Sequence, residues 1–128
     1  MKRFHVSRSV AAPPAVVWDL LVTVAQWPRW GPSVRAVELD AERITLGSRG
    51  VVETMVGVRL PFEVTHFEPG RAWSWTVGGV NATDHTVETT GSGTRVSFGV
   101  PWLAAPYLGI CAVALRRLDR LAGREIRR

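Results

Sequence analysis

The side chains best suited to chemistry in this sequence are its three histidines, His5, His66 and His85, and its single tyrosine, Tyr107. A histidine changes charge near neutral pH and can move a proton, and a tyrosine beside it can act as an acid. The histidines show no metal-binding spacing, so neither a metal site nor a cofactor is expected. We take His85, Tyr107 and His66 as the catalytic candidates, although a hydrogen-bonded strand histidine without a chemical role is the commoner outcome.

Other nucleophilic chemistry has little support. No serine lies in a nucleophile-elbow motif, and no glycine-rich phosphate loop follows a predicted strand. Cys111 is the only cysteine, which excludes an intramolecular disulfide, and its apolar helical setting favours a small core residue. Alternating residues, rather than the apolar segment of a signal peptide, follow Met1–Arg3, so we expect a reducing, cytoplasmic setting.

Six tryptophans in 128 residues are the most unusual feature of the composition. Each combines a large apolar ring with one N–H group that needs a partner when it is buried. Trp73 and Trp75 lie two residues apart and therefore on one face of a strand, which makes them the best candidates for stacking on a ligand. Trp30 and Trp102 are further candidates for a pocket wall, and Trp18 and Trp27 are predicted to belong to the core.

The net charge is +5, and every basic residue except Lys2 is an arginine. Arginines crowd the C-terminal end, at Arg116, Arg117, Arg120, Arg124, Arg127 and Arg128. Such a cluster could contact a membrane surface or an anionic partner, but the solvated face of a helix is the simpler interpretation and we favour it. Because the tryptophans are not interleaved with these arginines, nucleic-acid binding is not expected.

The elements that would position these residues follow from periodicity. Residues 2–10 alternate as a strand, and Pro13 and Pro14 then open a helix whose apolar face extends over residues 14–26. The segment from Trp27 to Pro32 breaks that helix and predicts a turn or a second short helix. From Val34 to Val100 the pattern is a series of strands separated by glycine turns, which indicates an antiparallel meander.

Residues 96–115 contain no charged side chain, which raises the possibility of a membrane span. Residues 96–100 alternate as a strand, however, and Pro101 and Pro106 interrupt any continuous helix. From Pro106 onward, apolar residues recur at helical spacing between arginines. We therefore predict an amphipathic helix of about 20 residues, roughly 30 Å long, and no transmembrane segment.

Four motifs, taken in order, resemble those of one superfamily. They are the opening Val10-Ala11-Ala12-Pro13-Pro14 with Val17-Trp18, the turn Trp27-Pro28-Arg29-Trp30-Gly31-Pro32, the hairpin Val64 to Glu68-Pro69-Gly70, and Gly93-Thr94-Arg95-Val96. With these motifs the chain resembles the SRPBCC superfamily of START lipid-transfer and pollen-allergen-like proteins, and within it the bacterial polyketide cyclase/dehydrase-like subgroup. The resemblance implies one α+β helix-grip domain over residues 1–128. In that fold a curved antiparallel sheet of about seven strands wraps around a long C-terminal helix, two short helices follow strand 1, and an apolar cavity lies between the sheet and the C-terminal helix.

Strand alternation then predicts which side chains face that cavity. Residues 62, 64 and 66 share one face of their strand, and His85 points away from its neighbour Asp84, so those two do not form a catalytic pair. The expected ligand-binding residues are Trp30, Phe62, Val64, Trp73, Trp75, His85, Trp102, Tyr107 and Ile110.

Three functions remain open. The first is the binding of a small hydrophobic molecule, such as a lipid, a polyketide or an aromatic metabolite. The second is a cyclase or dehydratase that uses a histidine or tyrosine of the cavity as acid and base. The third is a module that contacts a membrane surface or a partner protein through the arginine-rich helix end.

Overall fold

The computed structural model describes residues 3–126, except for the side chains of Trp102, Leu103, Ala105 and Ile126. A single antiparallel sheet has the strand order β1-β7-β6-β5-β4-β3-β2. Its strands are β1 (Arg3–Val10), β2 (Val34–Glu38), β3 (Arg49–Thr54), β4 (Arg59–Glu68), β5 (Ala72–Val77), β6 (Val80–Thr90) and β7 (Gly93–Pro101). Strands β2 to β7 form the expected meander, and β1 pairs with β7 as an edge strand of the sheet.

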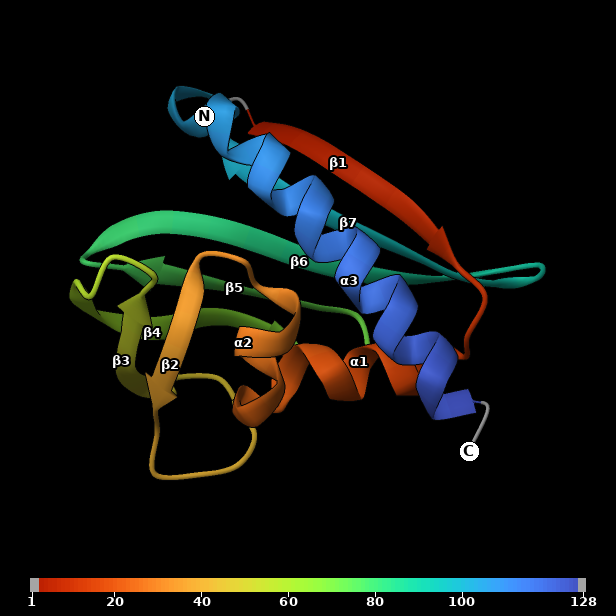
Figure 1. The fold of residues 1–128 in the computed structure, drawn as a ribbon, viewed down its shortest axis with the longest axis horizontal. Helices are drawn as coiled ribbons and strands as arrows, with labels where there is room; N and C mark the ends of the chain where they lie inside the picture. Colours follow the sequence, from red (N-terminus) through yellow and green to blue (C-terminus); the bar gives the residue numbers. More distant parts are fainter. Residues whose placement is uncertain (1–2, 127–128) are drawn as a thin grey trace.

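The helices lie on one side of this curved sheet (Figure 1). They are α1 (Pro14–Val22), the 3-10 turn η1 (Val24–Gln26), α2 (Trp27–Trp30), the 3-10 segment η2 (Trp102–Tyr107) and α3 (Leu108–Ile126). Helix α3 crosses in front of the sheet and packs on β1, β7, α1 and α2. Arg8 of β1 donates to Asp119 of α3 at 2.8 Å, which fastens the helix to the edge strand. The expected helix-grip arrangement is confirmed.

Helix α1 is shorter than the buried pattern of residues 14–26 suggested. It begins at Pro14, whose ring suits the first helical position, and it ends at Val22. Thr23 adopts an extended conformation and pairs with Arg43, so the chain leaves the helix to bond with the loop between β2 and β3. This early end allows a separate α2 to carry Trp27 and Trp30 over the sheet.

Strand β4 changes face in its second half. Phe62 and Val64 point into the core, as alternation predicts. The pairing with β5 then shifts register between Val64 and His66, so Thr65 is the extra residue of a bulge and the following side chains exchange faces. His66 is consequently exposed, whereas Phe67 packs against the core. The expected position of His66 inside the cavity is wrong.

The core lies between the concave face of the sheet and the helices. Its largest fully buried side chains include Trp27, Trp73, Phe98, Leu115 and Leu118. No helix within residues 3–126 is both long and apolar enough to cross a membrane.

Candidate functional site

The centre of the site is a stack of three aromatic rings. Trp73 of β5 lies parallel to Trp27 of α2, with ring centroids 5.3 Å apart. It also lies parallel to His85, its partner on β6, at 3.9 Å. Because Trp27 of α2 packs against Trp73 of β5, residues far apart in sequence form one continuous stack.

Other aromatic rings meet this stack by their edges. Trp75 is nearly perpendicular to both Trp27 and Trp73, at 5.2 and 5.4 Å. Phe98 of β7 contacts His85 edge-on at 4.8 Å, and Trp30 approaches both of these rings. Edge-to-face pairs place the positive rim of one ring on the negative face of another, so the cluster is favourable as well as dense.

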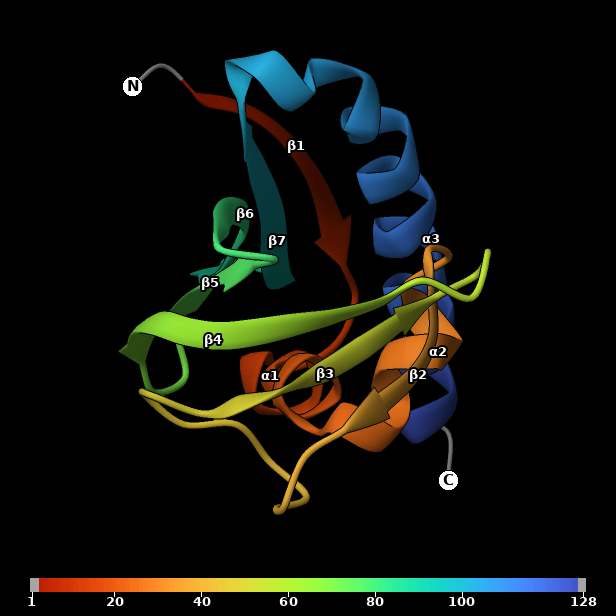
Figure 2. The same ribbon diagram turned by 90° about the vertical axis from the view of Figure 1, so that its left-hand side faces the viewer.

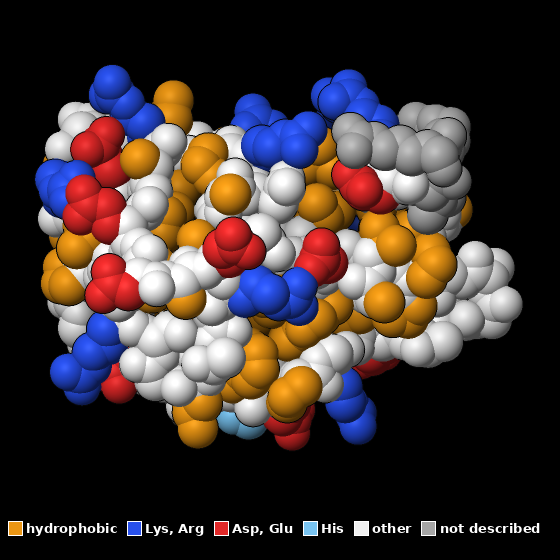
Figure 3. All heavy atoms as spheres, turned by 90° about the horizontal axis from the view of Figure 1, so that it is seen from below, with side chains coloured by type: hydrophobic (Ala, Val, Ile, Leu, Met, Phe, Trp, Pro, Cys, Tyr) orange, Lys and Arg blue, Asp and Glu red, His pale blue; other side chains and the backbone are white. Residues whose placement is uncertain are grey.

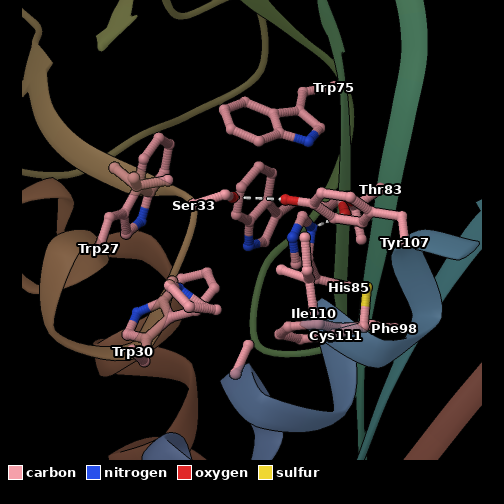
Figure 4. A pocket seen from close by; sticks show the side chains of 15 residues that line it. Trp27, Trp30, Ser33, Trp75, Thr83, His85, Phe98, Tyr107, Ile110 and Cys111 are labelled. Carbon is pink, nitrogen blue, oxygen red and sulfur yellow. Dashed lines mark hydrogen bonds between the residues drawn. The ribbon is translucent and has the colours of Figure 1, made fainter. Parts of the chain in front are cut away.

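These rings leave a small inner cavity of about 40 Å³ under the first turns of α3 (Figure 4). A volume of that size holds about three water-sized groups, since a single water needs about 10–15 Å³. Its lining consists of Trp27, Trp30, Gly31, Pro32, Ser33, Val34, Trp73, Trp75, Thr83, His85, Phe98, Tyr107, Ile110, Cys111 and Ala114.

His85 is neutral in this setting. Its Nδ1 lies 3.2 Å from the carbonyl oxygen of Trp73, which places the proton on Nδ1 and leaves Nε2 as an acceptor. Burial lowers the pKa of His85 to about 3, against the opposing effect of the Trp73 carbonyl. Asp84 points to the other face of the sheet and pairs with Arg3 at 2.5 Å, so it does not stabilise a positive charge on the imidazole.

Tyr107 closes the cavity on the side of α3. Its hydroxyl lies 2.6 Å from the hydroxyl of Ser33. Tyr107 ends η2 and Ser33 lies between α2 and β2, so this hydrogen bond joins the segment before α3 to the segment before β2. Burial raises the pKa of Tyr107, and the bond to Ser33 acts in the opposite direction. Burial also raises the pKa of the Cys111 thiol to about 11. Both groups keep their protons at neutral pH.

A larger outer groove of about 340 Å³ adjoins the inner cavity. Its lining includes residues next to the β3–β4 and β5–β6 turns, and these turns lie at the end of the molecule that faces the viewer in Figure 2. The two spaces share Ser33, Val34, Trp75, Thr83 and Tyr107, so the Ser33–Tyr107 bond lies at their boundary. The remaining lining of the groove is mostly apolar: Val52, Thr54, Leu60, Val77, Val80, Asn81, Ala82, Val100, Pro101 and Ala104.

The structure brings together six of the residues expected at the site. The inner cavity is lined by Trp30, Trp73, Trp75, His85, Tyr107 and Ile110, of which Ile110 is also partly exposed.

The other expected residues have different places. Phe62 and Val64 face inward but line neither space, because Trp27 and Trp75 cover Phe62. The side chain of Trp102 lies outside the described part of the structure.

Sequence reasoning missed two groups of residues. Trp27 was assigned to the core alone, yet it lines the inner cavity. The outer groove was missed as well. Its sequence signal was apolar residues next to the hairpin turns: Val52 and Leu60 pair across β3 and β4, and Val80 begins β6.

Most arginines outside α3 pair with carboxylates. The pairs are Arg3–Asp84, Arg8–Asp119, Arg35–Glu53, Arg43–Asp19, Arg49–Glu63 and Arg59–Glu38. Figure 3 shows one face on which arginine side chains lie among those of Asp and Glu. A different environment surrounds Arg29, Arg117, Arg120 and Arg124, which line one shallow pocket together with Leu121. Over residues 3–126, no carboxylate contributes to that lining.

A curved antiparallel sheet that wraps around a long C-terminal helix, with short helices after strand β1, is an α+β helix-grip fold. The family model described as "Polyketide cyclase / dehydrase and lipid transport" matches residues 1–123, and the chain belongs to this family. No curated protein matches the sequence.

Solved structures share the fold at low sequence identity. Protein MLL2253 from Mesorhizobium loti has a TM-score of 0.78 and 18% identity, over 96% of this chain and 98% of that one. Protein NE0264 from Nitrosomonas europaea has a TM-score of 0.73 and 18% identity, over 98% and 97%. XoxI from Bacillus cereus has a TM-score of 0.72 and 16% identity, over 94% of both chains. These likenesses concern the fold alone.

Proposed function

We propose that the protein binds a small hydrophobic molecule in the outer groove and directs one end of it into the inner cavity, and that it does so in the cytoplasm. The observation that carries this proposal is the groove of about 340 Å³, which is lined mostly by apolar side chains and lies beside the β3–β4 and β5–β6 turns. Apolar contact would supply the affinity, at about 25 cal/mol for each Å² removed from water. Membership in a family that includes lipid-transport proteins supports the same conclusion.

The test uses N-phenyl-1-naphthylamine, an uncharged probe whose fluorescence rises in apolar surroundings. We expect saturable binding to the native protein and displacement by neutral hydrophobic compounds. Val80 lines the groove and is 67% exposed, whereas Leu46 lies outside it and is 65% exposed. Val80→Arg should therefore weaken binding about tenfold, because it brings a charge into an apolar site, whereas Leu46→Arg should not. Equal affinity in both variants would place the probe elsewhere and contradict the proposal.

An acid–base role in catalysis has weaker support from the geometry. An imidazole with a pKa near 3 is a poor base at neutral pH, and burial makes Tyr107 a weaker acid than usual. The same neutral groups are well suited to orient a ligand by hydrogen bonds. We therefore assign His85 and Tyr107 to orientation within the proposed binding function.

A second candidate function is contact with an anionic membrane surface. The pocket lined by Arg29, Arg117, Arg120 and Arg124 favours it, because four arginines from two helices line one pocket. A protein that carries a hydrophobic ligand would gain from such contact at the membrane where the ligand is collected or delivered.

A further inference from the structure

The tryptophan at the centre of the site has no stacking surface to offer a ligand. Trp27 and His85 both lie parallel to Trp73, at 5.3 and 3.9 Å, and the side chain of Trp73 is 0% exposed. A planar ligand could stack on Trp73 only by displacing one of these rings. Trp73 therefore does not stack on a ligand through the face of its ring, and only the edge of the ring is left for a contact.

The edge of Trp73 carries an unused hydrogen-bond donor, and so does the edge of Trp75. Both Nε1 atoms are buried, and neither has a partner within the part of the chain that the structure describes. The other two indoles of the cavity differ, because Trp27 donates to the Leu21 carbonyl at 2.8 Å and Trp30 donates to the Leu20 carbonyl at 2.9 Å. A buried donor without an acceptor costs about 1–3 kcal/mol, so two such donors lining one cavity indicate an acceptor that enters from outside.

The acceptor must be uncharged. No charged side chain lines the inner cavity or the outer groove among the described residues, and His85 is neutral. A carboxylate or phosphate would be buried there without a counter-charge, at a cost of several kcal/mol. A carbonyl oxygen carries no such cost, and its two lone pairs can accept from two N–H groups.

The size of the cavity also favours a carbonyl group as the acceptor. About 40 Å³ accommodates a carbonyl group but no aromatic ring, and the body of the ligand would lie in the adjoining groove of about 340 Å³. Figure 4 shows the nitrogen edge of Trp75 on the side of Tyr107 and His85, where the two spaces meet. Water can satisfy such donors in the free protein, and a ligand oxygen that replaces it keeps both hydrogen bonds.

We propose that the Nε1–H groups of Trp73 and Trp75 form a recognition site for the carbonyl oxygen of an uncharged hydrophobic ligand, such as a ketone, an ester or an amide. The site selects such compounds over hydrocarbons of the same shape and over fatty acids and other carboxylates. This inference rests on the proposed function, because the groove must first bind the body of the ligand.

Three 2-substituted naphthalenes of similar size test the inference: 2-acetylnaphthalene, 2-ethylnaphthalene and 2-naphthoate, each competing with N-phenyl-1-naphthylamine. After correction for partitioning into alkane, we expect the ketone to bind at least about tenfold more tightly than the ethyl compound, as for a ligand that satisfies otherwise unpaired donors. The naphthoate should bind about a hundredfold more weakly than the ketone, because it buries an unpaired charge.

A variant and a spectrum identify the donors. Trp75→Phe removes one N–H group and keeps a ring, so the preference for the ketone should fall at least threefold. Trp18→Phe, in which the indole removed lies outside both spaces, should keep the full preference. In proton–nitrogen spectra of the native protein, the ketone should shift the indole N–H resonances of Trp73 and Trp75 more than those of Trp27 and Trp30.

The two proposals fail in different ways. If none of the three compounds displaced the probe, the proposed function would fall and the inference with it. If the ethyl compound bound as tightly as the ketone and the indole resonances of Trp73 and Trp75 did not move, the binding function would stand and the carbonyl site would be refuted. Tightest binding of the naphthoate would also refute it, because the cavity would then accept an anion.

Discussion

His85 shows how its neighbours determine the chemistry of one residue. The sequence places a histidine on the inward face of a strand, where an imidazole could transfer protons. The structure surrounds it with Trp73, Trp30 and Phe98, and gives its Nδ1 a single carbonyl partner. Because the apolar rings remove solvent from the charged form, the residue becomes a neutral acceptor rather than a base.

The buried imidazole makes the stability of the protein depend on pH. Its pKa is about 3 when folded and 6.5 when unfolded, so between these values only the unfolded state binds the proton. Stability should therefore fall as the pH drops below 6.5, by at most about 1.4 kcal/mol per pH unit for one proton, and should not change on this account above 6.5. Tyr107 and Cys111, in the same cavity, stay protonated throughout.

Urea unfolding at pH 7.5, 6 and 5 measures this effect, since carboxylates titrate mainly at lower pH. His85→Phe should flatten the dependence between pH 6 and 5. His66→Phe is the control, because that imidazole is exposed beside Glu68 and its variant should retain the native slope. A native slope in His85→Phe would show that another group is responsible.

The hydrogen bonds of single side chains could be predicted from the sequence only in part. The count and spacing of the tryptophans correctly placed Trp73 and Trp75 on one face. Which indole N–H has a partner depends on carbonyls at the C-terminal end of α1, which only the packing of α2 brings near Trp27 and Trp30. No local pattern records such a contact.

At the scale of elements, prediction succeeded where a local rule acts alone. Glycine turns about ten residues apart defined the hairpins, and prolines marked the beginning of α1. Prediction failed at Thr65, because a bulge depends on how two strands pair and not on either strand by itself. It failed again at the end of α1, where Thr23 pairs with a loop that lies far along the chain.

The bulge in β4 makes a testable distinction between neighbours. Phe67 packs on Trp18 with ring centroids 5.6 Å apart, and His66 faces solvent. Phe67→Ala should cost about 2 kcal/mol of unfolding free energy, less than a fully buried phenylalanine, because Phe67 keeps some exposure. His66→Ala should cost less than about 0.5 kcal/mol, as is usual for surface positions. Thermal and urea unfolding of the two variants would measure the difference, and the reverse order would mean that β4 alternates without a bulge.

Considered as a whole molecule, the protein separates its apolar groove from a cluster of arginines. The outer groove lies beside the β3–β4 and β5–β6 turns, whereas Arg29, Arg117, Arg120 and Arg124 gather where α2 meets the second half of α3. The sequence showed the arginine-rich helix end, and we favoured a solvated face. The position of α2 adds Arg29 to the cluster, and this contribution could not be read from the helix alone.

This cluster leads to a prediction about anionic surfaces. Each arginine close to an anionic bilayer contributes about 1 kcal/mol, so three of them contribute about 3 kcal/mol. The protein should sediment with phosphatidylcholine vesicles that contain phosphatidylglycerol, and not with phosphatidylcholine alone. Arg117→Gln, Arg120→Gln and Arg124→Gln together should remove most of this binding, and added salt should weaken it because exposed charges are screened.

The matched control separates a local site from net charge. Arg71→Gln, Arg95→Gln and Arg116→Gln remove the same charge from exposed positions that do not line the pocket. If a defined cluster binds the membrane, this second variant should sediment nearly as the native protein does. Equal losses in the two triple variants would mean that only the overall charge matters, and the helix end would then be the solvated face that its sequence first suggested.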